Sequence, residues 1–368
     1  MNLTMNNEFY NIIENALKHI PGNKDLASDF LSFRSGFYRY AVGKNDESAK
    51  LIDLVNIDGI IDDYSNQKFW NKKPIVSSSD LPKNAIVANC STAISPVAVN
   101  KMLLSSGVKN ILSFHELAYS SNEKLSLPRF VEEMREDYKN NKEKWLKVYS
   151  LLFDEESRKT FLDVIRYRLT ADPSYMEDYS VRINDQYFED FMNYKNEIFV
   201  DAGGFDGDTA IEFSKRYPDY KEILFFEPSS QNMKAARKRT KNLKNVEYYT
   251  CGLSDEDGEL SFSADNGSAS AVSNSGNDSI RVTLLDKVVN KSVSFIKMDL
   301  EGWEQKALSG CKNHIINDRP KLAIAVYHKA KDFYEIPSYI LSLHKDYKIY
   351  IRHYTQGWSE TIMYFLPK

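Results

Sequence analysis

The stretch Ile198-Phe-Val-Asp-Ala-Gly-Gly-Phe-Asp-Gly-Asp-Thr209 decides the fold of the second half of the chain. An apolar run ends on Asp201, a turn with three glycines follows, and a helical pattern of apolar residues begins at Thr209. A strand that passes through a tight glycine turn into a helix N-terminus is the arrangement that cradles a nucleotide-like cofactor. Glycine suits this turn because it adopts a positive φ and lets the backbone approach a ligand closely. We therefore expect Gly203, Gly204 and Thr209 to contact a cofactor.

The acid that follows the next apolar run supports this prediction. Residues 223–226 end on Glu227, which lies about twenty residues beyond the turn, the spacing at which a carboxylate reaches the ribose hydroxyls of a bound cofactor. Because strand, turn, helix start and second acid occur together, we assign Glu227 to the ribose. The alternative is an ordinary strand-turn-helix unit whose acids only cap helices. For Asp201 both roles stay open: ordering the loop or contacting the cofactor, and capping the helix.

The charges around the turn indicate which cofactor it binds. The dinucleotide-binding pattern G-x-G-x-x-G does not occur in this turn. Asp201, Asp206 and Asp208 crowd the place where a pyrophosphate would lie, and like charges at that distance repel each other. S-adenosylmethionine lacks phosphate and carries a cationic sulfonium and a cationic amino group. The sequence therefore predicts S-adenosylmethionine rather than a nicotinamide or flavin dinucleotide, with Asp206 among the cofactor-binding residues.

Further segments of the second half form a pattern with this turn. They are residues 199–209, 226–228, 252–255, 295–302, 325–329, and 352–354 with 360–361. With these segments in this order, the chain from about Glu197 to Lys368 resembles the FkbM family of S-adenosylmethionine-dependent methyltransferases. The resemblance implies a class I methyltransferase fold and methylation of a hydroxyl oxygen, often on a sugar or a secondary metabolite.

The composition is that of an ordinary globular chain, and 368 residues suggest two domains. A net charge of −4 argues against nucleic acid or an anionic membrane as the main partner. The cysteines Cys90, Cys251 and Cys311 are widely spaced without a C-x-x-C pair, so neither a disulfide framework nor a structural zinc site is expected. Polar residues follow Met1, and no run approaches the roughly 18 apolar residues of a membrane span. We therefore expect a cytoplasmic protein with no membrane span.

The chain is expected to be organised in three parts. Alternating strand-like and helix-like segments over residues 1–128 predict a small, partly parallel α/β module, which resembles the Rossmann-like modules that precede the catalytic domain in some sugar-modifying enzymes. Its first turn has one glycine, Gly43, so we expect a structural or substrate-positioning role rather than a second cofactor site. Residues 129–192 read as a charged helical linker, typical of a bridge between domains or of a contact in a homodimer. Residues 193–368 form the methyltransferase domain.

The expected fold class is α/β. The methyltransferase domain should be a Rossmann-like sheet, mostly parallel with an antiparallel C-terminal hairpin. Residues 6–35 have apolar residues at helical spacing, and Asp154 is expected to cap the second helix of the linker. The serine-rich stretch 263–279 is expected to be a loop, either a lid beside the cofactor cleft or a plain surface loop.

Acids follow the later strands at the edge where ligands bind in an open α/β sheet. Asp255 follows the third strand, where this fold often contacts the adenine amine, although a turn-forming role is the alternative. Asp299 and Glu301 follow residues 293–298 and are assigned to the cofactor. The same two residues could bind substrate hydroxyls, hold the methionine moiety or ligate a cation. Two carboxylates do not define a metal site, and we predict no required metal.

Methyl transfer to a hydroxyl needs a base that removes its proton. Histidine titrates near neutral pH, and His328 follows residues 322–327 at the expected edge, so it is the first candidate. His353, at the end of residues 347–352, and Asp299 are the alternatives. Where it is not the base, His328 orients the substrate or caps a loop.

The sequence therefore favours an S-adenosylmethionine-dependent O-methyltransferase that acts on a hydroxyl of a sugar or glycan, for example in a surface polysaccharide. The alternative is a nucleotide-sugar-binding or regulatory protein that keeps the fold without methyl transfer. A nicotinamide-dependent oxidoreductase is disfavoured because the turn is acidic and lacks the dinucleotide pattern.

Overall fold

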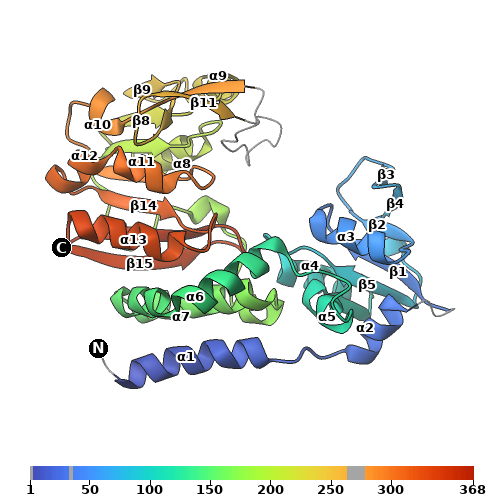
Figure 1. The fold of residues 1–368 in the computed structure, drawn as a ribbon. Helices are drawn as coiled ribbons and strands as arrows, with labels where there is room; N and C mark the ends of the chain where they lie inside the picture. The colour runs from blue at the N-terminus through green and yellow to red at the C-terminus, as the bar shows by residue number, and fades with distance from the viewer. Residues whose placement is uncertain (1–2, 33–35, 263–277) are drawn as a thin grey trace. The chain divides into compact units, whose positions relative to one another are not determined.

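The computed structural model describes residues 3–32, 36–262 and 278–368 (Figure 1). The chain divides into two compact units. The first unit comprises Met1–Lys142, Lys159–Arg182 and His353–Ser359. The second unit comprises Glu143–Arg158, Ile183–Arg352 and Glu360–Lys368. The predicted helical linker thus contributes to both units. Most of the predicted serine-rich loop, residues 263–277, lies outside the described residues.

The first unit contains a mostly parallel sheet in the order β3-β4-β2-β1-β5-β6. Strand β1 lies at its centre and pairs in parallel with β2 and β5. The strands are β1 (Tyr38–Val42), β2 (Gly59–Ile61), β3 (Phe69–Trp70), β4 (Lys73–Val76), β5 (Ala85–Asn89) and β6 (Asn110–Ser113). The helices of the chain before Ile183 are α1 (Leu3–Lys18), α2 (Lys24–Leu31), α3 (Asp46–Leu54), η1 (Ser78–Asp80), α4 (Pro96–Ser105), α5 (Phe114–Ser120), α6 (Arg129–Leu151), α7 (Glu155–Thr170) and η2 (Pro173–Met176). Helices α6 and α7 have residues in both units.

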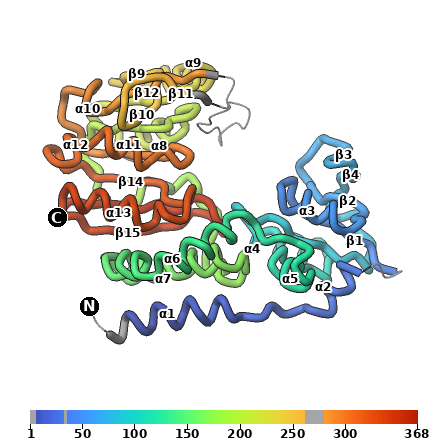
Figure 2. Tube along the Cα trace, in the orientation of Figure 1, coloured from blue at the N-terminus to red at the C-terminus, as the bar shows by residue number. Residues whose placement is uncertain are grey.

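Helices cover both faces of this sheet. Successive residues of a strand face opposite sides, and β5 shows the consequence. Ile86 lies in one hydrophobic cluster with Phe30 of α2 and Leu117 of α5, two helices that lie side by side in Figure 2. Val87 lies in a second cluster with Leu103 of α4. The predicted small α/β module is therefore a three-layer arrangement with its own core.

Two details of the helical segments follow from local sequence. The N-terminal helical region is divided, because Pro21 and Gly22 fall between α1 and α2, and both residues disfavour a helix interior. Helix α7 begins after Asp154, whose Oδ1 accepts a hydrogen bond from the Ser157 amide at 2.8 Å. The predicted cap at Asp154 is confirmed.

The second unit contains a seven-stranded sheet in the order β15-β16-β14-β13-β7-β8-β9. Its strands pair in parallel from β14 to β9, and β16 runs antiparallel to β14. The strands are β7 (Ile198–Ala202), β8 (Glu222–Phe226), β9 (Val246–Tyr249), β13 (Phe295–Met298), β14 (Lys321–Ala325), β15 (Tyr347–His353) and β16 (Thr361–Pro367), with a smaller sheet of β10 (Gly252–Leu253), β12 (Asp278–Thr283) and β11 (Gly258–Phe262). The helices are η3 (Ile183–Asp185), η4 (Asp190–Met192), α8 (Asp208–Arg216), α9 (Ser230–Arg239), α10 (Leu285–Val288), α11 (Glu304–Ser309), α12 (Lys312–Asn317) and α13 (Asp332–Leu343). This is the predicted class I methyltransferase sheet.

The sheet order places a ligand crevice beside β7. Strand β7 lies between β8 and β13, so the chain order reverses there, and ligands of such sheets bind beyond the carboxyl ends of the strands at this point. Aromatic packing fixes the first helix against these strands. The ring of Phe213 in α8 lies 4.5 Å from that of Phe199 in β7, which in turn stacks on Phe295 of β13 at 4.6 Å. The glycine turn between β7 and α8 is therefore held at both ends.

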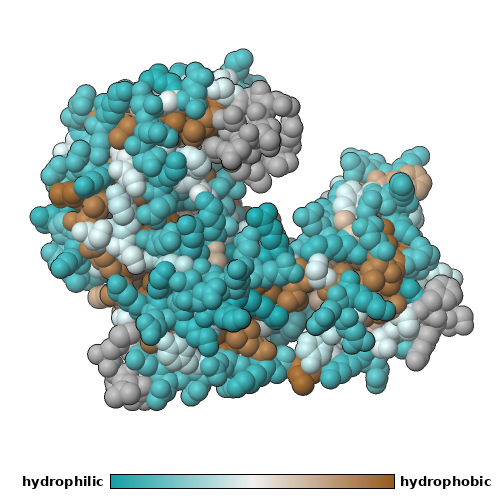
Figure 3. Space-filling view, in the orientation of Figure 1, coloured by the Kyte–Doolittle hydropathy of each residue, from teal (hydrophilic) through white to brown (hydrophobic). Residues whose placement is uncertain are grey.

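Hydrophilic residues predominate on the face of the chain shown in Figure 3. Across the described ranges, no helix combines the length and the apolar character that a bilayer crossing requires. The three cysteines are buried free thiols.

Candidate cofactor and active site

A pocket with a cavity volume of about 320 Å³ lies at the carboxyl ends of β7, β8 and β13. The predicted site residues that line it are Gly203, Thr209, Glu227, Asp299 and Glu301. These residues follow three different strands, and the fold brings them together around one hollow. The predicted residues Asp201, Gly204, Asp206, Asp255, His328 and His353 are not among its lining residues.

The turn after β7 needs its glycines for close packing. Gly203 has φ +74°, and a Cβ there would lie 2.0 Å from the backbone oxygen of Asp299. A Cβ on Gly204 would lie 2.3 Å from the ring of Phe225. The amides of both glycines donate to the Phe226 carbonyl at 3.0 Å. These two amides are therefore committed to the sheet and not to a phosphate, which agrees with a cofactor that lacks phosphate.

Asp201 lies beneath this turn in an ion pair. Its side chain is fully buried, and its Oδ1 lies 3.2 Å from Lys297 Nζ. Burial raises the pKa of the Asp201 carboxyl, and Lys297 opposes the rise. Lys297 Nζ also donates to the Gly203 carbonyl at 2.7 Å. This geometry matches the loop-ordering role considered for Asp201, and the signal for its partner was a lysine inside the apolar run of β13.

Glu227 is held in a fixed orientation at the end of β8. Its Oε2 accepts from the Phe205 amide at 3.1 Å, and its Oε1 accepts from the Ser229 amide at 2.8 Å. Burial raises the pKa of this carboxyl, and these hydrogen bonds, together with that of Asn232, lower it. Glu227 and Asn232 both line the pocket. The backbone thus presents a pre-oriented carboxylate, as a ribose contact requires.

Asp206 and Asp255 form ion pairs with helices. Arg239 of α9 contacts both carboxylate oxygens of Asp206 at 2.7 Å. Asp255 Oδ1 accepts from the Ser254 hydroxyl at 3.1 Å and lies 3.6 Å from Lys306 Nζ. Their assignment to the cofactor stays a prediction, and these contacts supply each of them with a structural role.

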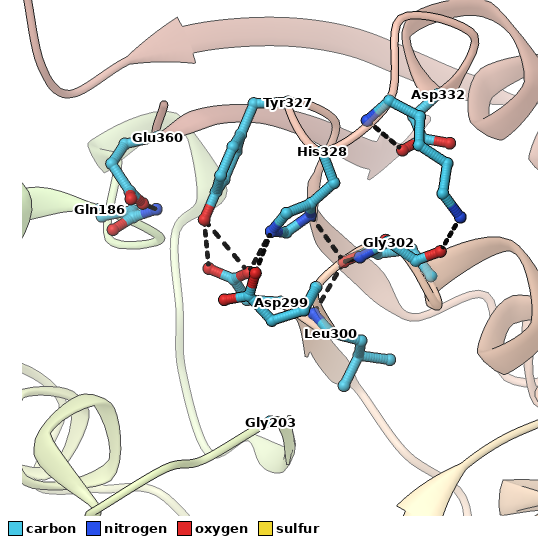
Figure 4. Close-up of polar contacts among 12 residues, drawn as sticks. Gln186, Gly203, Asp299, Leu300, Gly302, Tyr327, His328, Asp332 and Glu360 are labelled. Carbon is cyan, nitrogen blue, oxygen red and sulfur yellow. Dashed lines mark hydrogen bonds and ion pairs between the residues drawn. The ribbon is translucent and has the colours of Figure 1, made fainter. Parts of the chain in front are cut away.

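Asp299 is the centre of a polar cluster at the end of β13 (Figure 4). The Tyr187 hydroxyl donates to its Oδ2 at 2.7 Å, and the Tyr327 hydroxyl lies 3.4 Å from both oxygens. His328 Nε2 lies 3.5 Å from Oδ1. The carboxylate is therefore surrounded by hydroxyl donors and an imidazole ring. Tyr187 and Tyr327 also line the pocket, and neither was predicted.

His328 lies among carboxylates rather than at the pocket wall. Its Nε2 lies 3.3 Å from Glu301 Oε2, and its Nδ1 lies 3.1 Å from Oε1 of the buried Glu304. Burial lowers the pKa of His328, but the contacts with Glu301 and Glu304 outweigh it and raise the pKa well above the ordinary value. These contacts favour the protonated imidazole, the form that has no lone pair with which to accept a proton. This geometry does not support the predicted base role of His328.

Glu304 ties this cluster to the backbone. Its Oε1 accepts from the Leu300 amide at 2.7 Å, which closes the turn that carries Glu301 at φ +53°. One atom each of Asp299, Glu304 and His328 lie within 4.8 Å of one another, a spacing that a metal ion could use. His328 already contacts both carboxylates, and we assign no metal to them.

Glu360 is a pocket residue to which the sequence pattern assigned no role. It precedes β16, has φ +64° and accepts a hydrogen bond from Gln186 Nε2 at 2.8 Å (Figure 4). Burial, followed by repulsion from Asp299, raises the pKa of its carboxyl to about 7. The only signal in the sequence was its place in the family-like segment 360–361.

His353 belongs to the first unit. Its Nε2 lies 3.2 Å from the Thr355 hydroxyl, and its ring packs edge-on against Tyr179. Burial, then Arg168 and Arg182, lower its pKa to about 3. A histidine with so low a pKa is a weak base, and these contacts explain it as a buried structural residue.

The carboxyl edge of the first unit's sheet is covered by the chain itself. In residues 353–359, the Gln356 amide donates to the Ile94 carbonyl at 2.7 Å, and the Trp358 amide donates to the Thr92 carbonyl at 3.2 Å. Gln356 Oε1 accepts from the Ala98 amide, in the first turn of α4, at 2.9 Å. The loop after β5 and the start of α4 therefore bind a segment of this chain.

Comparisons with known proteins give a family match for the second unit and a similar fold for the whole chain. Residues 201–349 match the family model of the methyltransferase FkbM domain. The crystal structure of methyltransferase FkbM from Methylobacillus flagellatus KT is 21% identical, with a TM-score of 0.74 over 99% of each chain. An rRNA methylase from Streptococcus thermophilus is 18% identical over 47% of this chain and 88% of its own, with a TM-score of 0.32. Fibrillarin from Aeropyrum pernix, solved with natively bound S-adenosyl-L-methionine, is 12% identical over 50% of this chain and 71% of its own, also with a TM-score of 0.32.

No curated protein sequence matches the chain. The family match over residues 201–349 and the shared fold together confirm the predicted family and enzyme class. The chain therefore carries an FkbM methyltransferase domain, that of an S-adenosylmethionine-dependent methyltransferase.

Proposed function

We propose that the pocket of the second unit binds S-adenosylmethionine and that the enzyme transfers its methyl group to a hydroxyl of a sugar or glycan. The observation that carries this proposal is the pre-oriented Glu227 carboxylate, which lines one hollow with the glycine turn and with Asp299. A cavity of about 320 Å³ is of the size that small-molecule ligands occupy.

The lining suggests how the cofactor lies. Glu227 would hold the ribose hydroxyls, and Thr209 at the start of α8 would lie beside them. Leu253, Ile280 and Trp303 form an apolar part of the lining that suits the adenine ring. The charged end of the methionine would then lie towards the carboxylates at the end of β13. When bound, the cofactor supplies the methyl group and the sulfonium leaving group.

The lining also suggests the class of acceptor. Asp299, Glu301 and Glu360 gather on one wall of the pocket, and carboxylates repel phosphate while they accept hydrogen bonds from hydroxyls. A neutral acceptor rich in hydroxyl groups, such as a sugar, fits this wall. A nucleic acid does not fit, because its affinity depends on cations that neutralise phosphates.

The free, buried cysteines agree with a reducing cytoplasm, where thiols stay reduced. From the sequence, we also propose a homodimer formed through the helical segments 129–192. Sedimentation of the full chain would test it.

The test is transfer of a labelled methyl group. The full chain would be incubated with methyl-labelled S-adenosylmethionine and a panel of monosaccharides, nucleotide sugars and oligosaccharides, and the products identified by mass spectrometry. We expect an O-methylated sugar from the wild type and none from Glu227→Ala at the same cofactor concentration. Binding of nucleotide sugars without any labelled product, and without binding of S-adenosylhomocysteine, would instead support a binding protein with this fold.

A further inference from the structure

We propose that Glu360 is the general base of the methyl transfer, the carboxylate that takes the proton of the acceptor hydroxyl. This inference rests on the proposed function, because it concerns the same pocket. It replaces His328, His353 and Asp299 as candidates for that role.

The backbone and a neighbour hold Glu360 at the pocket. Glu360 lines the pocket together with Asp299 and Tyr327. Its φ of +64° is in the left-handed region, which residues other than glycine adopt rarely and which clusters at functional sites. Gln186 donates to its Oε2 at 2.8 Å (Figure 4). The group is therefore placed for chemistry rather than left free in solvent.

The other groups at this wall are committed to partners. Both ring nitrogens of His328 contact glutamates, Nε2 lying 3.3 Å from Glu301 and Nδ1 3.1 Å from Glu304, so neither nitrogen is open to an acceptor hydroxyl. Asp299 accepts hydrogen bonds from two tyrosine hydroxyls. Glu301 forms an ion pair with His328. Glu360 differs from these carboxylates. In the part of the chain that the structure describes, its hydrogen-bond donor is the neutral side-chain amide of Gln186.

The surroundings of Glu360 make it a stronger base than an ordinary glutamate. Burial and the nearby Asp299 raise its pKa to about 7, while Gln186 and His328 oppose the rise. A base is most effective when its pKa lies near the working pH. The charged and titratable groups that face it are Tyr187, Asp299, Glu301, Tyr327 and His328.

The proton and electron pairs balance in this step. The carboxylate takes the proton of the acceptor O–H, and the oxygen lone pair forms the new bond to the methyl carbon. The C–S bond of the sulfonium breaks, and its electron pair stays on sulfur. One positive and one negative charge disappear together, so a buried, low-dielectric wall favours the products. The protonated Glu360 then returns its proton to solvent.

The test compares Glu360→Gln with the wild type of the full chain. Glutamine keeps the size and the contact with Gln186 but cannot accept the proton. We expect single-turnover methyl transfer to an acceptor from the sugar panel to fall about 10²–10⁴-fold, with the affinity for S-adenosylhomocysteine unchanged in calorimetry. The wild-type rate should rise with pH through about 7, as the carboxyl ionises, and this rise should be absent in the variant.

Control variants separate this inference from others. Glu335→Gln makes the same chemical change on α13, where Glu335 pairs with Lys331, and should behave as wild type. Glu360→Asp should lose less activity than Glu360→Gln and keep the pH dependence, which a purely structural role would not produce. If Glu360→Gln keeps both rate and pH profile while Asp299→Asn loses them, the inference is wrong. If the wild type methylates no sugar and binds no S-adenosylhomocysteine, the proposed function fails instead.

Discussion

The two units of this chain contain parallel sheets of related design, and their carboxyl edges differ. In the second unit, the strands β7, β8 and β13 end on glycines and acids that line a pocket of about 320 Å³. In the first unit, β1 lies between β2 and β5, so its chain order reverses as well. There, however, Asn45 Nδ2 donates to the Cys90 carbonyl at 2.6 Å, and residues 353–359 bind the loop after β5. The carboxyl edge of the second unit's sheet thus contains an acidic pocket, whereas that of the first unit's sheet is closed by polar groups of the chain itself.

The strand order creates a crevice in which a ligand could bind, but the loops at the ends of the strands determine whether that crevice is open. In the turn after β7, Gly203 has φ +74° and packs against the backbone of Asp299. Gly203 and Phe205 of this turn line the pocket. The turn after β1 has Gly43, whose Cβ position would lie 3.3 Å from the Asn45 side chain. A bridging asparagine occupies that crevice. For the described residues, this contrast favours the proposed cofactor site in the second unit and agrees with the expected structural or substrate-positioning role of the first unit.

The largest expected effect contrasts glycines of the two units. Gly203→Ala puts a Cβ 2.0 Å from the Asp299 carbonyl oxygen at φ +74°. Left-handed backbone costs about 1–2 kcal/mol for a residue with a Cβ, and overpacking adds about 1–3 kcal/mol. Gly107→Ala in the first unit has φ +90° but nothing within 4 Å, so it should cost the backbone term alone. Denaturant unfolding and calorimetry with S-adenosylhomocysteine measure both effects, and equal loss of binding in the two variants would argue against a site at Gly203.

The next effect isolates the ribose contact. Glu227→Ala removes a carboxylate that would receive charge-assisted hydrogen bonds from the cofactor, so binding of S-adenosylhomocysteine should weaken by about 2–4 kcal/mol. Thermal unfolding without ligand should change far less than binding does, because Glu227 contacts loop amides at the pocket and not the core. Glu222→Ala serves as the matched control at the other end of β8, since Glu222 pairs with Lys291 and does not line the pocket. Unchanged affinity in Glu227→Ala would remove this residue from the site.

Part of the candidate site could be predicted from the sequence alone. The turn after β7 and the acid after β8 could be predicted because strand, turn and acid lie close together in the chain. Gln186, Tyr187 and Glu360 could not be predicted, since Gln186 and Tyr187 follow a short helix and Glu360 precedes β16, so none of them follows a parallel strand of the sheet. Their residue types alone carry no signal. Asp206 and His328 were recognised as strand-end polar residues. Their partners depend on tertiary packing, which a linear pattern does not contain.

The two histidines proposed as bases should respond to pH in opposite directions. The pKa of His328 is raised, so its stabilising contribution is present below about 6.5 and is lost as pH rises through the folded-state pKa. The pKa of His353 is lowered to about 3, so the first unit loses stability as pH falls below about 6.5, by about 3 kcal/mol at pH 4. The unfolding free energies of both variants would be measured at pH 4, 7 and 9. His328→Gln should no longer lose stability between pH 7 and 9, and His353→Gln should no longer lose stability between pH 7 and 4. The same dependence in both variants would contradict these environments.

The smallest effect concerns the closed edge. Gln356→Ala removes the acceptor for the Ala98 amide at the start of α4 and the donor to the Tyr179 carbonyl, which together should cost about 1–2 kcal/mol of stability. The affinity for S-adenosylhomocysteine should not change, because Gln356 is not among the lining residues of the pocket. Stronger ligand binding in this variant, with a second binding event, would show instead that residues 353–359 block a ligand site in the first unit.

One titration decides between one site and two. Calorimetry of the full chain with S-adenosylhomocysteine should give a single binding event with one ligand per chain, and Gly203→Ala should abolish it while Gly107→Ala keeps it. No binding heat in the wild type, two ligands per chain, or binding that survives in Gly203→Ala would contradict the assignment of the cofactor to the carboxyl edge of β7, β8 and β13.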